Sequence, residues 1–250
     1  MSSVQPDPAF FAAALSEVFR AINWTKLGSM YCHEGGEDFF PPEQVEAIQD
    51  AGLHFASDLG EALLEAPTKA GRSLYVGAAV AELPVALFDH LMLGREVVMV
   101  ARQSPETTEL NRALKAASKK VDRKLPRIEA KDLGLRENAP QGSFDHVWMV
   151  SVLTDPEAFP ALHNRLYGRF GTELEVRGGN EGRERNWAAR LVDQAMSSLV
   201  PPAWIFTTNE ELELISEGAD RAGLRLKVPD AARLSAIVGD PVYLCRVLRR

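Results

Sequence analysis

Cysteine is scarce in this chain. Its 250 residues include two cysteines, Cys32 and Cys245, which lie far apart in the sequence. Two distant cysteines supply neither a disulfide framework nor the paired ligands typical of a zinc site. We therefore expect a reduced, cytoplasmic protein.

Long apolar runs are missing too. No apolar stretch reaches the roughly 20 residues that a membrane-spanning helix needs. Residues 1–8 lack the basic start and the apolar core of a signal peptide. We therefore expect no membrane partner.

The chain also lacks an excess of basic residues. Its formal net charge is -7, which argues against a nucleic-acid-binding protein held by bulk charge. A local basic run follows a predicted helix, and its spacing is typical of a solvated helix face and exit. The run comprises Lys115, Lys119, Lys120, Arg123, Lys124 and Arg127.

The composition, 46% apolar and 25% charged, is that of a globular protein. In the first 70 residues, apolar spacing predicts a helix over 9–22 and one or two amphipathic helices over 43–66. Glycine and proline predict an irregular segment over 23–42. We interpret residues 1–70 as an N-terminal helical extension.

A polar segment at 31–38 raises the question of a metal site. It contains Cys32, His33, Glu34, Glu37 and Asp38. Adjacent Cys and His side chains rarely bind one ion together, and no second ligand pair follows downstream. We therefore expect no metal site.

Residues 73–83 form the segment around which the chain is organised. A short apolar strand is followed by the small residues Gly77, Ala78 and Ala79 and then by the start of a helix. Backbone N–H groups at a helix start have no partner within the helix and lie at its positive end, so they suit a nucleotide-like ligand. Small residues here also serve close packing alone, and both interpretations stay open.

From this segment onward, strands alternate with helices. Strands are predicted at 74–76, 96–101, 128–130, 144–153, 171–177, 224–228 and 241–248, the last two as an antiparallel hairpin. Helices are predicted at 82–93 and 105–117, from 154–157 onward, and at 183–199 and 210–222. This order predicts an α/β, doubly wound, seven-stranded and mostly parallel sheet with a C-terminal antiparallel hairpin. The domain would span 71–250, with an inserted helix at about 181–200.

This pattern resembles the class I S-adenosylmethionine-dependent methyltransferases, over roughly residues 70–250. Gly77, Ala79 and Ala81 occupy the three small positions of the family's glycine-rich turn, and Asp132 matches the acid after strand three. Tyr75 stands where the family has an acid, and strand two ends without the acid that binds the ribose. The strand at 144–153 matches its family counterpart most closely, and its end would border the ligand crevice.

The resemblance implies an S-adenosylmethionine site and a small-molecule or protein acceptor, but no catalytic residue. The residues implied at the cofactor are Tyr75, Gly77, Ala79, Ala81, Glu82, Ala101, Arg102, Asp132, Leu133 and Ser151.

Two alternatives remain. The missing acids favour a catalytically inactive member of this fold that serves as a binding or structural module. Arg102 after strand two resembles the residue that meets the 2′-phosphate in NADP-binding dehydrogenases, but no tyrosine here has a lysine four residues on. For the inactive member, the expected partner includes a second copy of the chain, in a homodimer through the N-terminal helices or the hairpin edge.

Overall fold

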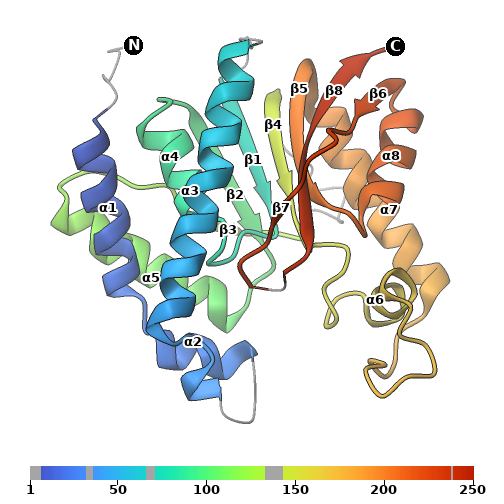
Figure 1. Ribbon diagram of the computed structural model, residues 1–250, viewed down its shortest axis with the longest axis horizontal. Coiled ribbons are helices and arrows are strands. Elements are labelled where there is room, and N and C mark those ends of the chain that lie inside the picture. The colour runs from blue at the N-terminus through green and yellow to red at the C-terminus, as the bar shows by residue number, and fades with distance from the viewer. Residues whose placement is uncertain (1–6, 32–35, 66–70, 133–142, 238) are drawn as a thin grey trace. The chain divides into compact units, whose positions relative to one another are not determined.

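The structure, a computed structural model, describes residues 7–31, 36–65, 71–132, 143–237 and 239–250 (Figure 1). The chain forms two compact units. The first contains Met1–Pro67, Gly71–Lys131 and Leu234–Gly239; the second contains Thr68–Ala70, Asp132–Arg233 and Asp240–Arg250. The proposed division at residue 70 stays a prediction.

The first unit contains three parallel strands. They are β1 (Arg72–Val76), β2 (Glu96–Ala101) and β3 (Ile128–Ala130), with β2 in the middle. Leu74 and the rest of β1 after its first residue are buried, as expected for an apolar strand covered by helices. Because all three strands run the same way, their carboxyl ends lie along one edge.

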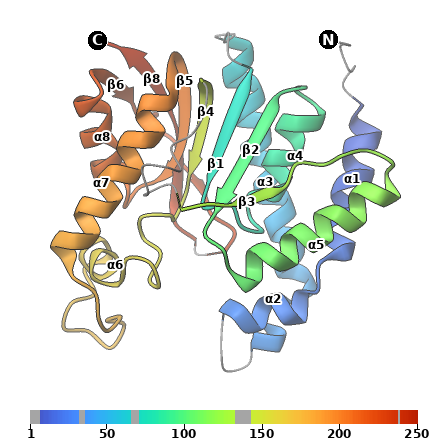
Figure 2. The ribbon, with the colours of Figure 1, turned by 180° about the vertical axis from the view of Figure 1, so that it is seen from behind.

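Helices pack around these strands. Helix α1 contacts both α4 and α5, and α3 packs along α4 (Figure 2). The N-terminus of α5 is capped by the Ser104 hydroxyl, which accepts from the Thr107 N–H at 3.0 Å. The helical elements are α1 (Pro8–Ala21), α2 (Trp24–Tyr31), the 3-10 helix η1 (Gly36–Asp38), α3 (Pro42–Glu65), α4 (Leu83–Leu91) and α5 (Pro105–Lys120).

Helix α2 corrects the prediction of an irregular segment over 23–42. The Asn23 side chain accepts the Lys26 N–H at 3.0 Å and so starts the helix. A Cβ at Gly28 would lie 2.1 Å from the carbonyl oxygen of Gly36. This glycine therefore permits a close backbone approach and does not break the helix.

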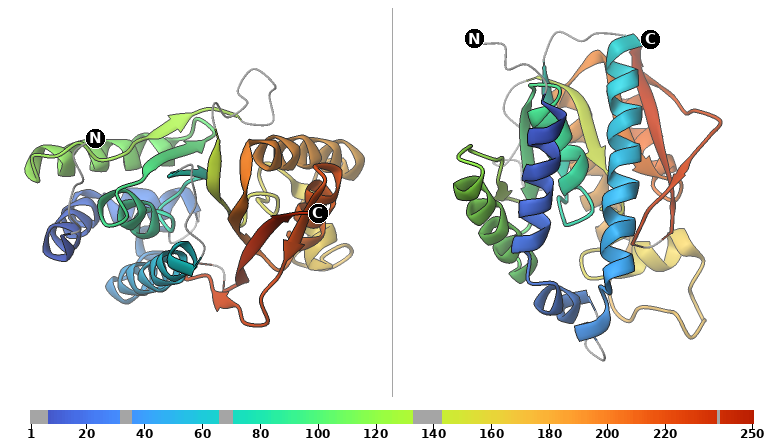
Figure 3. Two further views of the ribbon diagram at one scale, coloured as in Figure 1. Left: turned by 90° about the horizontal axis from the view of Figure 1, so that it is seen from above. Right: turned by 60° about the vertical axis from the view of Figure 1, so that its left-hand side comes forward.

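The second unit contains a mixed set of strands. Strands β4 (Phe144–Met149) and β5 (Leu199–Thr208) are parallel, and β8 (Pro241–Arg249) runs antiparallel between β5 and β6 (Leu224–Lys227) (Figure 3). The predicted antiparallel pairing of the last two long strands is confirmed. The remaining elements are α6 (Pro160–Tyr167), α7 (Glu181–Ser198) and α8 (Leu212–Arg221). The two-residue strand β7 (Arg233–Leu234) has one residue in each unit.

The strand predicted at 171–177 is wrong. Leu174 is 68% exposed, and the Glu175 N–H bonds locally to the Thr172 carbonyl at 3.2 Å. The Asn164 side chain of α6 bonds both backbone groups of Val176. Its amide donates to the Val176 carbonyl at 2.7 Å and accepts the Val176 N–H at 2.9 Å. A side chain thus uses the groups that a neighbouring strand would have bonded.

Two boundaries near β4 also differ from the prediction. The strand ends at Met149 rather than at 153, shortly before Ser151, whose φ of 56° is outside the range of a strand. Helix α6 starts at Pro160, later than predicted, because Asp155 accepts the N–H groups of Glu157 and Ala158 and forms a turn first.

The predicted α/β class, with mostly parallel strands followed by antiparallel C-terminal strands, is confirmed. Among the described residues, no helix is both long and apolar enough to cross a membrane.

Two glycines of α3 give a matched test of helix packing. A Cβ at Gly52 would lie 2.6 Å from the Pro84 ring of α4, whereas at Gly60 the nearest atom is 3.7 Å away. We expect Gly52→Ala to destabilise the protein by about 1–3 kcal/mol, because a proline ring cannot swing aside. Gly60→Ala should stabilise it by about 0.5–1 kcal/mol through helix propensity. Urea denaturation of both variants measures this, and a stabilised Gly52→Ala protein would contradict the close approach.

Candidate functional site

The carboxyl-terminal edge of β1 and β2 gathers most of the residues that the sequence assigned to the cofactor. Val76 pairs with Val100, and one residue later the Ala78 N–H donates to the Val100 carbonyl at 3.1 Å. Gly77 has a φ of 70°, a conformation that favours glycine. The turn carrying Gly77, Ala79 and Ala81 is therefore anchored to the end of β2, close to Ala101 and Arg102.

A carboxylate occupies this turn. Glu82 is 4% exposed, and its Oε2 accepts the Ala79 N–H at 2.8 Å. The turn amide that an anionic ligand would use is therefore bonded to the chain's own negative charge. The sequence named Glu82 as a site residue but did not predict this orientation.

Tyr75 belongs to a buried polar network. Its side chain is fully buried, and its hydroxyl donates to Asp89 Oδ2 on α4 at 3.1 Å. Arg95 forms an ion pair with Asp89 at 2.7 Å and donates to the Ser73 hydroxyl at 3.0 Å. Burial, and then the neighbouring Asp89 carboxylate, raise the pKa of the Tyr75 phenol well above its ordinary value. Tyr75 thus has a core role, and its predicted contact with a cofactor stays a prediction.

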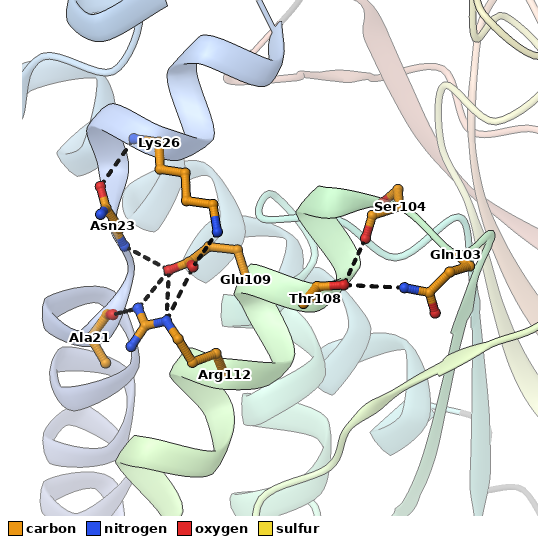
Figure 4. Close-up of polar contacts among 8 residues, drawn as sticks. All are labelled: Ala21, Asn23, Lys26, Gln103, Ser104, Thr108, Glu109 and Arg112. Atoms are coloured by element: carbon orange, nitrogen blue, oxygen red, sulfur yellow. Dashed lines mark hydrogen bonds and ion pairs between the residues drawn. The ribbon is translucent and has the colours of Figure 1, made fainter.

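The loop after β2 is fastened to the first turn of α5. The Arg102 carbonyl accepts from the Thr107 hydroxyl at 3.0 Å. The Gln103 amide donates to the Thr108 hydroxyl at 3.1 Å (Figure 4). The Arg102 side chain is exposed at the end of the strand. The backbone on both sides of the edge is therefore held by local hydrogen bonds.

One turn further along α5, Glu109 has a structural role. Its nearly buried carboxylate accepts the Asn23 N–H at 3.0 Å, bonds to Arg112 and lies 3.7 Å from the Lys26 ammonium (Figure 4). The hydrogen bond from Arg112 is the main cause that lowers the pKa of Glu109. This carboxylate fastens the link between α1 and α2 to α5.

The remaining predicted site residues lie elsewhere. Asp132, half-buried, and Ser151 belong to the second unit, and Leu133 lies outside the described residues. The Ser151 hydroxyl oxygen is buried, and it has no hydrogen-bond partner in the described part of the chain. The predicted meeting of Asp132 and Ser151 with the Gly77 turn stays a prediction.

The second unit contains a buried carboxyl group that the sequence analysis missed. Glu211 is fully buried at the end of β5 and accepts from the Leu153 N–H at 2.5 Å and the Thr207 hydroxyl at 3.2 Å. Burial raises the pKa of Glu211 to about 7, although these donors favour the charged form. Nothing in the sequence indicated that Glu211 is buried, because an acidic residue at the start of a helix is more often exposed.

A second polar chain lies on and beside α6. Arg169 Nη1 lies 2.7 Å from His163 Nε2, and because the guanidinium can only donate, that nitrogen accepts. His163 Nδ1 therefore donates to the Thr154 carbonyl at 2.6 Å. The Arg169 guanidinium also lies 4.7 Å from the ring centroid of Tyr167, whose hydroxyl donates to Asp240. Both nitrogens of His163 are thus in use, which leaves no base there for a substrate.

The described residues provide neither a metal-binding cluster nor a reactive thiol. These contain no group of three or more His, Cys, Asp or Glu side chains placed to hold a metal ion. Cys32, His33 and Glu34 lie outside the described residues. Cys245 is free and buried, and burial raises the pKa of its thiol to about 12.

The raised pKa of Glu211 predicts how stability depends on pH. The carboxyl group is neutral in both states at low pH, and between about 4.5 and 7 the native state holds its proton more tightly than the unfolded chain. Stability therefore falls as pH rises through this window, by about 3 kcal/mol in total.

Glu211→Gln tests this linkage. Urea titrations give the free energy of unfolding of the wild type and of this variant at each pH. We expect the wild-type value minus the variant value to decrease between pH 4.5 and pH 7.5. Glu213→Gln on the exposed face of α8 is the control and should give a flat difference. A flat difference for Glu211→Gln as well would show that this carboxyl group titrates normally.

Comparisons with known proteins give matches in structure alone. No protein-family model matches the chain, and no curated protein is detectably similar to it in sequence.

Solved structures of methyltransferases resemble this chain. The O-methyltransferase from Bacillus cereus in complex with SAH is 12% identical, with 99% of this chain and 94% of that chain covered and a TM-score of 0.47. A methyltransferase from Pyrococcus furiosus is 12% identical, with coverage of 78% and 83% and a TM-score of 0.46. For the precorrin-6y C5,15-methyltransferase from Geobacter metallireducens, identity is 12%, coverage is 72% and 79%, and the TM-score is 0.42. At this identity and with TM-scores below 0.5, these likenesses assign no cofactor and no substrate to the chain.

Proposed function

We propose that this protein binds S-adenosylmethionine and transfers its methyl group to a small-molecule or protein acceptor. The observation that carries the proposal is the Glu82 carboxylate bonded to the Ala79 N–H in the turn after β1. S-adenosylmethionine has a sulfonium cation, an ammonium group and one carboxylate, so it is cationic overall, and it has no phosphate. A turn that carries a fixed negative charge suits such a ligand.

The same carboxylate disfavours a dinucleotide. In dinucleotide-binding folds the pyrophosphate sits on the amides of this turn and on the helix start behind it. Here a pyrophosphate would lose the Ala79 amide and face Glu82, and two like charges 4 Å apart repel by about 4 kcal/mol at an effective dielectric constant of 20. Arg102, which favoured an NADP-binding protein, directly follows the neighbouring strand β2 and is not part of the turn itself.

The strands and the chemistry also support the proposal. Gly77 follows β1 with positive φ and leads into α4, while β8 lies antiparallel between β5 and β6, the ending on which the resemblance to class I methyltransferases rests. Bound S-adenosylmethionine would supply an activated methyl group. The protein would contribute alignment and the exclusion of water, so no strong catalytic group is required of the chain.

A second candidate is a catalytically inactive protein that keeps this fold for binding. It is favoured by Tyr75, whose hydroxyl is committed to Asp89, and by the end of β2, where Ala101 supplies no acid. A ribose acid contributes charge-assisted hydrogen bonds of about 1.5–3 kcal/mol each, so its absence weakens a site by tenfold or more.

Isothermal titration of the purified protein separates these candidates. We expect S-adenosylmethionine and S-adenosylhomocysteine to bind at micromolar concentrations and NADPH not to bind. Glu82→Gln keeps a hydrogen-bond acceptor but removes the charge, so affinity for the cationic S-adenosylmethionine should fall by about 3–10-fold, more than for the neutral thioether S-adenosylhomocysteine.

Glu61→Gln, an exposed change on α3, is the matched control and should leave both affinities unchanged. Absence of binding up to millimolar concentrations would reject the enzyme and favour the inactive module. Binding of NADPH alone would instead restore the oxidoreductase alternative.

Asp132 provides an independent check on the extent of the site. If it contacts the cofactor, Asp132→Ala should weaken binding of S-adenosylmethionine several-fold, because a hydrogen-bond acceptor is lost. Asp230→Ala, at an exposed position of the second unit, is the control for a lost surface charge. An unchanged affinity in Asp132→Ala would remove this residue from the site.

A further inference from the structure

A hollow of about 380 Å³ lies at the C-terminal end of α5 and the loop that follows it. Five cationic side chains and a single acid line it, although the chain as a whole has a net charge of -7. We propose that this hollow binds a small, multiply charged phosphate compound. Its charged lining residues are Lys115, Lys119, Asp122, Arg123, Lys124 and Arg127.

Ion pairs within the protein do not explain why these lysine and arginine side chains gather at the hollow. Lys120, in the same run, lies 3.7 Å from Glu17 of α1, but it does not line the hollow. Of the lining cations, Arg123 is stacked 5.2 Å from the ring centroid of Phe10. In the described part of the chain, no carboxylate lies within ion-pair distance of the other four, Lys115, Lys119, Lys124 and Arg127.

The helix dipole explains only part of the cluster. Cations in the last turn of a helix gain about 0.3–1 kcal/mol from the negative end of the dipole, and this effect falls off within one turn. It accounts for Lys119 in the last turn of α5. It does not account for Lys124 and Arg127, which follow in the loop, and mutual repulsion makes such a group unfavourable without an anion.

The backbone under the cations is fixed. The Ser118 hydroxyl donates to the Leu114 carbonyl at 2.7 Å and accepts the Leu125 N–H at 3.1 Å, so it joins the helix end to the loop. Leu125 is buried beneath the hollow. The charged side chains thus extend from a preorganised turn, which reduces the entropy lost when a ligand binds.

The size and chemistry of the hollow favour a small ligand. A volume of about 380 Å³ is within the range of small-molecule sites. Its two arginines can bond phosphate oxygens in pairs, and its three lysines supply point charges. Its described lining residues include no aromatic side chain, whereas single-stranded nucleic acids are usually held by stacking on aromatic rings.

This hollow is separate from the proposed cofactor edge. Helix α5 begins next to the end of β2, and the hollow is at its other end. Sixteen helical residues span roughly 24 Å. A ligand in the hollow therefore does not touch the turn that carries Glu82, and the proposal stands whether or not S-adenosylmethionine binds.

Isothermal titration with inorganic triphosphate tests the proposal. We expect binding in the micromolar to submillimolar range at low salt, weakening as salt rises because bound counterions compete. Lys119→Ala and Arg127→Ala should each weaken binding by about threefold or more, and the double variant by about tenfold or more. Exposed cations of the second unit give matched controls, Lys227→Ala and Arg190→Ala, which should change affinity less than twofold.

Three results would overturn the proposal. The first is no binding of triphosphate up to about 10 mM, a weaker interaction than any specific site would give. The second is an equal loss of affinity in the control variants, which would indicate general charge attraction. The third is binding of a short single-stranded RNA through Lys119 and Arg127 without binding of triphosphate, which would assign the surface to a nucleic acid.

Discussion

The first unit depends on one buried ion pair. Asp89 is fully buried, Arg95 is 8% exposed, and their charged atoms lie 2.7 Å apart. Removing one partner of such a pair costs about 3–5 kcal/mol, because the other charge is left buried and unpaired. The hydroxyls of Tyr75 and Ser73 complete the network from β1. Because Gly77 follows Tyr75 by two residues, the network that holds β1 to α4 also fixes where the turn begins.

This network also gives a physical reason for the tyrosine at position 75. A carboxylate there would bring a second negative charge next to Asp89, in a fully buried region where solvent screening is weak. A phenol donates to Asp89 and adds no charge. The negative charge of the edge is supplied instead by Glu82, which reaches the turn from the start of α4. The choice of tyrosine at this position is therefore coupled to the packing of α4.

Short sequence patterns predicted correctly those strands and helices whose structure depends on only a few neighbouring residues. The strands at 96–101 and 128–130 match the prediction, since an apolar run acts over a few residues. The segment 171–177 failed because the amide of Asn164 replaced a neighbouring strand. Glu211 and Asp89 could not be recognised, because what distinguishes them from exposed acids is the burial created by distant segments.

Charge is arranged along α5 and its neighbours in a way that separates two kinds of ligand. At the β2 end of the helix, the Glu82 carboxylate disfavours phosphate in the turn after β1. At its other end, Lys119 and Arg127 belong to a hollow with a surplus of positive charge. Over roughly 24 Å of helix the direct interaction between the two regions is screened at physiological salt, where the Debye length is about 8 Å. On these two proposals, each region would select its ligand by its own charge, and a phosphate compound in the hollow would not compete with a cationic nucleoside at the edge.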